Sequence, residues 1–248
     1  MPRNLGLPLA ALVLVGSIPA MAAEDGFVAL FNGRDLAGWR VPAGDNGHWK
    51  VVDGVIDYDA RSEASGDKSL WTDKEYGDFV LRAEWRIKET PYVNPNVTIV
   101  LPDGTNKKGP DGKVIRIAVP DSDSGLYLRG QPKAQVNIWC WPVGSGEVYG
   151  YRTDDQLPAG VRAGVTPKTI ADRDVGEWNA FEITLKGDRL TVVLNGRTVL
   201  QEAHLPGVAA KGPIGLQHHG EWKDGQWVSP PALVQFRNVQ VKELAGSR

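Results

Sequence analysis

The 248-residue chain has a single cysteine and no excess of positive charge. Cys140 cannot form a disulfide within one chain, so a hydrophobic core has to provide the stability. It lies on the apolar phase of its predicted strand, and we expect it to be buried and inert. With 28 Lys and Arg against 30 Asp and Glu, the chain cannot neutralise the phosphates of a nucleic acid, so we expect no nucleic-acid partner.

Long stretches with the 3.6-residue periodicity of a helix are absent after residue 23. Short runs that alternate apolar and polar residues recur instead, separated by many of the 29 Gly and 17 Pro residues. The glycines over 144–150 are spaced wrongly for a dinucleotide-binding loop, and no P-loop motif occurs. The sequence therefore predicts an all-β fold without a nucleotide site.

The first 22 residues have the composition of a secretory signal. Arg3 supplies a positive start, an apolar run covers 5–18, and small residues at 20–22 offer a cleavage site. The apolar run is too short and too interrupted by Pro and Gly to span a bilayer. We expect a signal peptide at 1–22 and a domain at 23–248 that has no membrane span and no cysteine for a lipid anchor. The alternative is that this segment stays uncleaved as an N-terminal anchor. If it is cleaved, we expect the protein to be periplasmic or secreted.

Alternation is clearest over 79–88, where Phe79 and Trp85 share one face with the other apolar residues. Further strands are predicted over 180–186, 189–194 and 197–203. The turn between the last two contains Asn195-Gly196, the preferred pair for a type I′ turn. Segments 90–120 and 154–174 are rich in Pro, Gly and Asp, and we predict long loops there.

Four predicted strands each have a polar face. These positions are Glu84 and Arg86 in 79–88, Tyr127 and Arg129 in 125–129, Gln135, Asn137, Trp139 and Trp141 in 134–141, and Gln217 and His219 in 215–219. If the strands are neighbours in one curved sheet, they form a groove that suits a sugar, because aromatic rings stack on its C–H faces while amides and charges bind its hydroxyls. A solvated sheet face is the alternative for 79–88.

Two motifs resemble metal sites without matching them. The segment 121–125 alternates side-chain oxygens like a Ca²⁺ loop but lacks the Gly and Glu of an EF-hand, which favours a turn. His218 and His219 are adjacent on a strand and point to opposite faces, and we expect His218 in the core. No cofactor is identified from the sequence, and the use of a divalent cation is left open.

Six blocks resemble, in order, the 3-keto-disaccharide hydrolase domain family of bacterial secreted proteins. They are FVALFNGRDLAGW (27–39), LWTDKEYGDFVLRAEWRI (70–87), DSGLYLRG (123–130), VGEWNAFEITLKGDRLTVVLNG (175–196), KGPIGLQHHG (211–220) and FRNVQVKEL (236–244). The resemblance implies a single-domain, concanavalin A-like jelly-roll β-sandwich. It also implies an enzyme whose substrates are glycosides oxidised to a ketone at C3.

Such a ketone acidifies the C2 hydrogen, so a base can remove it while the aglycone leaves C1, and water then adds back. We assign His219 as base or acid, Glu84 as its carboxylate counterpart, and Arg86 or Arg129 as clamps for the enolate or hydroxyls. The other predicted saccharide-binding residues are Tyr127, Gln135, Asn137, Trp139, Trp141, Glu147 and Gln217.

The chain departs from the family pattern at one strand, where many relatives have a sequence like E-x-Q-I-x-D. Here it reads Gln135-Val136-Asn137-Ile138-Trp139-Cys140, so no acid/base or metal role passes to Gln135 or Cys140. Glu147 is the nearest alternative carboxylate. Segment 90–120 is also longer than the short connection that is common in the family before the block at 123–130. A non-catalytic carbohydrate-binding module and a structural domain of the cell envelope are the competing functions.

The nine tryptophans divide into two predicted groups. For five of them packing is the expected role: Trp39, Trp49, Trp71, Trp85 and Trp178. The remaining four are expected to contact sugar: Trp139, Trp141, Trp222 and Trp227.

Overall fold

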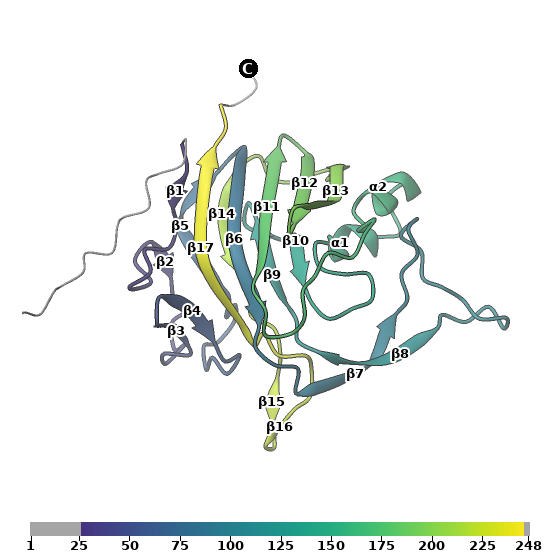
Figure 1. Ribbon diagram of the computed structural model, residues 1–248, viewed down its shortest axis with the longest axis horizontal. Helices are drawn as coiled ribbons and strands as arrows, with labels where there is room; N and C mark the ends of the chain where they lie inside the picture. Colours follow the sequence, from purple (N-terminus) through teal and green to yellow (C-terminus); the bar gives the residue numbers. More distant parts are fainter. Residues whose placement is uncertain (1–25, 246–248) are drawn as a thin grey trace, which may run out of the picture.

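The computed structural model describes residues 26–245, and the predicted signal peptide lies outside that range. Strands dominate (Figure 1), which confirms the predicted all-β class. Within 26–245, no helix has the length and apolar character that a membrane crossing requires.

The larger of two sheets has eight strands. They are β1 (Val28–Ala29), β3 (Trp49–Val52), β4 (Val55–Tyr58), β6 (Phe79–Ile87), β11 (Asn179–Lys186), β12 (Arg189–Leu194), β13 (Arg197–His204) and β17 (Val234–Glu243). Their order is β13-β12-β11-β6-β17-β4-β3, with β1 paired to β17.

The smaller sheet has five strands in the order β10-β9-β14-β5-β2. They are β2 (Trp39–Arg40), β5 (Leu70–Tyr76), β9 (Ser124–Leu128), β10 (Gln131–Ile138) and β14 (Gly212–Leu216). Outside the two sheets lie the pairs β7 (Tyr92–Thr98) with β8 (Arg116–Asp121) and β15 (Trp222–Lys223) with β16 (Gln226–Trp227), and the short helices α1 (Tyr149–Arg152) and α2 (Ala159–Gly164).

Local sequence explains the β11–β12–β13 meander. Asn195 and Gly196 both have positive φ, 51° and 78°, as a type I′ turn requires. Phe181 pairs with Leu194 and Ile183 with Val192, so apolar side chains meet on one face. The predicted strands and turn are confirmed here.

The hydrophobic core fills the space between the sheets. Leu81 and Trp85 of β6 and Leu126, Val136 and Leu216 of the smaller sheet are at most 1% exposed and belong to one cluster. Since side chains alternate along a strand, the polar residues between these positions point away from the core. The sandwich therefore has two polar outer faces, one on each side.

Segment 90–120 is not a loop throughout. Strands β7 and β8 pair antiparallel, with Tyr92 opposite Asp121 and Thr98 opposite Arg116, and form an arm that projects from the sandwich (Figure 1). The prolines in both strands and a register shift between Asn94 and Val97 obscure the alternation, which is why sequence reasoning predicted a loop. The segment 154–174 contains only the one-and-a-half turns of α2.

Candidate functional site

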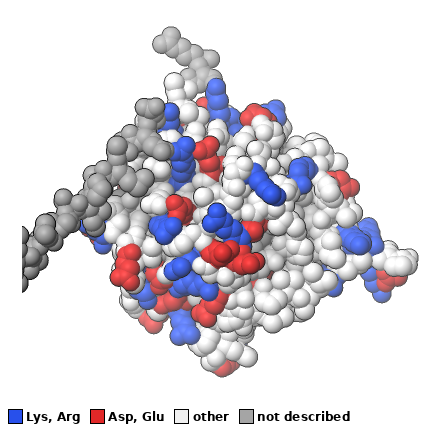
Figure 2. Space-filling model, viewed as in Figure 1, with Lys and Arg blue, Asp and Glu red and all other residues white. Residues whose placement is uncertain are grey.

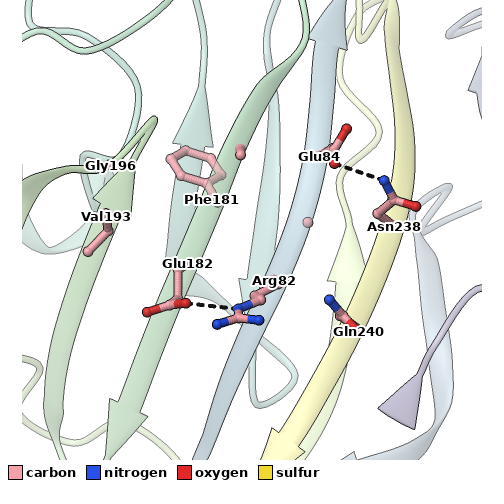
Figure 3. Close-up of a pocket in the computed structure, with 10 residues that line it drawn as sticks. Arg82, Glu84, Phe181, Glu182, Val193, Gly196, Asn238 and Gln240 are labelled. Carbon is pink, nitrogen blue, oxygen red and sulfur yellow. Dashed lines mark hydrogen bonds and ion pairs between the residues drawn. The ribbon is translucent and has the colours of Figure 1, made fainter. Parts of the chain in front are cut away.

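Glu84 lies on the outer face of the larger sheet, where strand β6 runs between β11 and β17. Its carboxylate accepts hydrogen bonds from Arg237 Nε at 2.6 Å and Asn238 Nδ2 at 2.8 Å. Figure 3 shows the latter contact beside the Arg82–Glu182 pair, at a cavity of about 290 Å³. Lys, Arg, Asp and Glu intermingle over this face (Figure 2).

Arg86 is on the same outer face. Its Nε donates to Gln235 Oε1 at 2.7 Å, and its guanidinium lies 4.8 Å from the centre of the Trp178 ring. His219 follows β14 of the other sheet, so Glu84 and Arg86 are on the opposite side of the sandwich from it. The prediction that they share a groove with His219 is wrong, because alternation within a strand does not reveal which sheet the strand joins.

Arg129 is not available to a ligand. Its side chain is 1% exposed and pairs with Asp78, 2.8 Å from Nη2. The remaining guanidinium contacts are to backbone carbonyls: Nε to Gly77, Nη1 to Gly187 and Ala209, and Nη2 to Leu185. Arg129 follows the end of β9 with a φ of 50°, which turns it off the strand phase. Its predicted substrate role is wrong, and it ties the sheets together instead.

Trp139 also departs from its predicted role, because β10 ends at Ile138 and the period of two no longer applies. The chain turns back, with Gly146 N–H donating to Asn137 O. Trp139 is 5% exposed, donates from Nε1 to Gly144 O at 2.9 Å, and stacks on Trp141 at a centroid distance of 4.4 Å. Trp139 therefore packs and adds only a small area to a cavity of about 300 Å³, whereas the half-buried Trp141 lines that cavity and another of about 320 Å³.

Glu147 is fully buried and forms an ion pair with Arg152. Burial raises the pKa of Glu147 to about 7, and the Arg152 charge opposes that rise. The predicted direct contact of Glu147 with saccharide is wrong, because its side chain has no exposed surface.

The outer face of the smaller sheet gathers the remaining predicted residues. Tyr127 lies opposite Gln135 on β10 and Gly215 on β14, so these positions share a face, and Gln217 follows on the same phase. Gln135 Nε2 donates to Gln217 Oε1. Asn137 is on this face too, 3% exposed, and within residues 26–245 its Nδ2 has no hydrogen-bond partner.

An aromatic pair extends this face toward β5. The Trp71 ring stacks on Tyr127 at a centroid distance of 5.2 Å and an interplanar angle of 12°. Gly215 makes this possible, since a Cβ there would lie 2.7 Å from the indole. Burial raises the pKa of Tyr127 to about 12, so its hydroxyl stays protonated and can donate at neutral pH. Trp71, predicted only to pack, is thus part of the face.

Asp123 and His219 form an acid–base pair at the end of this face, hereafter the Asp123–His219 pair. Asp123 Oδ2 lies 4.0 Å from His219 Nε2, and the two side chains are 17% and 36% exposed. His219 Nδ1 contacts Pro230 O at 2.6 Å. Because a carbonyl only accepts, Nδ1 carries the hydrogen, and in the neutral ring Nε2 presents its lone pair toward Asp123.

The surroundings of the Asp123 carboxyl favour its protonated form. Burial raises its pKa to about 7, the His219 charge lowers it, and Asp121 raises it further. Its Oδ1 is buried and has no hydrogen-bond partner within the described residues. Sequence reasoning missed Asp123 because 121–125 was interpreted as a turn. Gly125 and Tyr127 lie on this face, and the period of two along a strand places Asp123, two residues before Gly125, on the same face.

A single backbone segment braces both members of the pair. Pro231 O accepts from Asp123 N at 3.2 Å and from Ser122 Oγ at 2.6 Å, while Ala232 N donates to His219 O at 2.9 Å. Gly220 permits this approach, since its φ is 105° and a Cβ there would lie 2.7 Å from Pro231 Cα. The pair is held by main-chain contacts on both sides.

The sequence profile of the 3-keto-alpha-glucoside-1,2-lyase-like domain family matches residues 26–242. The chain belongs to this family. No protein among those of curated function matches it in sequence. A crystal structure from Parabacteroides distasonis ATCC 8503, named as a candidate glycosyl hydrolase, superimposes with a TM-score of 0.57 at 22% identity, covering 89% of this chain and 84% of that one. A second from the same organism and with the same name gives 0.53 at 20% identity, covering 89% and 95%.

These likenesses to solved structures establish the fold, and the family assignment confirms the resemblance drawn from the six sequence blocks. In this 3-keto-alpha-glucoside-1,2-lyase-like domain, His218 is half-buried beside the core residue Tyr58 and is not itself in the core. Its Nδ1 lies 2.6 Å from the Tyr58 hydroxyl, and burial lowers its pKa to about 4. Cys140 is half-buried, and burial raises the pKa of its thiol to about 12, so a thiolate is disfavoured.

Trp222 and Trp227 face each other across β15–β16 at a centroid distance of 5.0 Å. The Arg61 guanidinium lies 4.0 Å from the Trp222 ring centre, and both line a cavity of about 520 Å³ with Gly220. Their contact with sugar stays a prediction. Within 26–245, no group of three or more His, Cys, Asp or Glu side chains could hold a metal ion.

Proposed function

We propose that this protein cleaves the glycosidic bond of 3-keto-α-glucosides by eliminating the aglycone across C1 and C2. The observation that carries the proposal is the Asp123–His219 pair, in which a carboxyl with a pKa of about 7 faces an imidazole nitrogen on a saccharide-compatible face. The family name supports the substrate class and the bond that breaks.

The reaction needs two proton transfers and one stabilised oxygen. A base removes the C2 proton, and its electron pair forms the enolate of the C3 ketone. The enolate then expels the C1 substituent, forming a C1–C2 double bond, while an acid protonates the departing oxygen. Addition of water to this double bond gives the hydrolysis product.

We assign protein groups to these steps from their positions in the structure. His219 Nε2 carries the free lone pair and takes the C2 proton, since Nδ1–H is held by Pro230 O. Asp123, whose raised pKa favours the protonated carboxyl, donates to the leaving oxygen. The protonated Tyr127 hydroxyl is the donor for the enolate oxygen, in the manner of an oxyanion hole.

Saccharide binding fits the surroundings of the pair. Trp71 offers half-buried aromatic surface stacked on Tyr127, and Tyr127, Gln135 and Gln217, each 8–9% exposed, present small polar areas to a hydroxyl. Neither amide gains or loses a proton during turnover. They therefore position the ring, and the Asp123–His219 pair performs the chemistry.

The experiment is turnover of a chromogenic 4-nitrophenyl 3-keto-α-glucoside carrying deuterium at C2. Release of nitrophenol with a primary isotope effect on kcat is the expected result, because the C2–H bond breaks. His219→Gln should lower kcat about 10²–10⁴-fold with little change in KM. Saccharide affinity without turnover would contradict the proposal and favour a binding module, and turnover unchanged in His219→Gln would contradict the assigned base.

A further inference from the structure

A polar cavity of about 320 Å³ lies where the β7–β8 arm meets α1 and the loop after β10. We call it the arm pocket. Asn94 of β7 and Arg116 of β8 line one side, and Trp141, Tyr149 and Arg152 line the other. Neither member of the Asp123–His219 pair lines it. Its volume is at the lower end of the range of small-ligand sites, about 300–1,000 Å³.

The arm pocket has positive charge and no carboxylate in its lining. Arg116 donates from Nη1 to Asn96 O at 3.0 Å, and within residues 26–245 it forms no ion pair. The second cation, Arg152, is held against the buried Glu147 and lies 5.3 Å from the centre of the Tyr149 ring. Arg116 is exposed and carries the uncompensated charge.

Aromatic rings complete the pocket. Trp141 stands nearly perpendicular to Tyr149, at a centroid distance of 6.2 Å and an angle of 83°. One indole face of Trp141 is fixed by stacking on the buried Trp139. Tyr149 is 43% exposed. Rigid aromatic surface beside guanidinium and amide groups is the combination that binds a sugar ring with a charged substituent.

A buried carboxylate connects the arm pocket to the catalytic pair. Asp121 is 0% exposed, and its Oδ2 accepts from Asn94 Nδ2 at 2.9 Å and Trp141 Nε1 at 3.0 Å. Both donors line the pocket, and Asp121 is two residues before Asp123. One short segment thus sets the position of the pocket wall and of Asp123.

We propose that the arm pocket is a saccharide subsite selective for a sugar unit bearing a negative charge, either a carboxylate or a sulfate ester. The inference rests on the proposed function, since the charged unit is part of the substrate whose 3-keto residue lies at the Asp123–His219 pair. The guanidinium of Arg116 pairs with the anionic group, while Trp141 and Tyr149 contact the ring.

Titration calorimetry with four probes tests this on the full protein. Methyl glucuronide carries a carboxylate, glucose 6-sulfate carries a sulfate ester, methyl glucoside is neutral, and sodium acetate or sulfate provides the anion without the sugar. We expect at least one charged sugar to bind about 10-fold or more tightly than methyl glucoside and than the free anions. Whichever charged sugar binds better identifies the substituent.

Arg116→Gln should remove this discrimination, and Arg116→Lys should keep part of it. The matched control is Lys113→Gln, which deletes one exposed positive charge from the same arm outside the pocket lining. Equal affinity for charged and neutral sugars would overturn the proposal. Free anions that bind as tightly as the charged sugars, or equal losses in Arg116→Gln and Lys113→Gln, would overturn it as well.

Turnover of the neutral chromogenic substrate separates the two proposals. Arg116→Gln should retain wild-type turnover of that substrate, because the charge it recognises is absent. If Asp123→Asn loses turnover while the wild type does not discriminate between the sugars, only the subsite inference fails. If discrimination is present but the wild type does not turn over the chromogenic substrate, only the proposed function fails.

Discussion

The two outer faces of the sandwich have similar patterns in sequence and different chemistry in space. On the larger sheet the charges are paired across strands: Glu84 with Arg237 at 2.6 Å and Arg82 with Glu182 at 2.8 Å. On the smaller sheet the face consists of amides and stacked rings, and it ends in Asp123, whose Oδ1 has no partner among the described residues.

The difference shows that pairing, rather than polarity, separates a solvated face from a candidate site. The carboxylate of Glu84 is paired with Arg237 and 29% exposed, so it has little reason to bind a ligand. Asp123 is more deeply buried, and burial raises its pKa to about 7. The predictions below test this contrast, from the largest expected effect to the smallest.

Arg129→Met should destabilise the protein by about 3–5 kcal/mol, because it leaves the Asp78 carboxylate and buried carbonyls without their donor. The matched change on the larger sheet is Arg237→Met, which breaks a half-exposed pair and should cost about 0–1 kcal/mol. Urea unfolding of both variants measures the difference. Similar losses would show that burial does not distinguish the two arginines.

Asp123→Asn should change how stability depends on pH. The raised pKa means that between about pH 4 and pH 7 the folded state holds a proton that the unfolded state has lost, so the wild-type free energy of unfolding falls as pH rises through this window. The asparagine variant should lose this slope, by up to about 1.4 kcal/mol per pH unit. Glu147, whose pKa is also raised by burial, is present in both proteins and contributes equally to both slopes. Identical slopes in urea unfolding would contradict the burial of Asp123.

Gly125→Ala should disturb the smaller sheet's face, because a Cβ there would lie 2.3 Å from Gln135 Nε2 and 2.8 Å from Val136 O. We expect a loss of about 1–3 kcal/mol in stability and weaker saccharide binding. Gly160→Ala, where a Cβ meets nothing within 4 Å, is the control and should leave both unchanged. A Gly125→Ala variant with native affinity would show that the Gln135 amide does not bind saccharide.

Within strands, the sequence predicts the structure well. The phase of β6, β9, β11 and β12 follows from alternation because each side chain's direction is set by its neighbours along the chain. The phase fails where a strand ends, as at Trp139 and Arg129, since a turn or a positive φ changes the direction of the next side chain.

Sheet membership could not be predicted in the same way. β9 pairs with β14, which is nearly ninety residues later in the chain, and β6 pairs with β17 rather than with either of them. Such long-range pairing depends on the packing of the whole core. This is why the sequence predicts His219 beside Glu84, whereas in the structure it lies beside Asp123.

The most direct measurement of the central claim compares Asp123→Asn with Glu84→Gln in turnover of 4-nitrophenyl 3-keto-α-glucoside. Each variant replaces one carboxyl with an amide of similar shape, on opposite faces of the sandwich. Asp123→Asn should lower kcat about 10²–10⁴-fold, and Glu84→Gln should retain it within about twofold. Equal losses, or a loss confined to Glu84→Gln, would contradict the assignment of the active face.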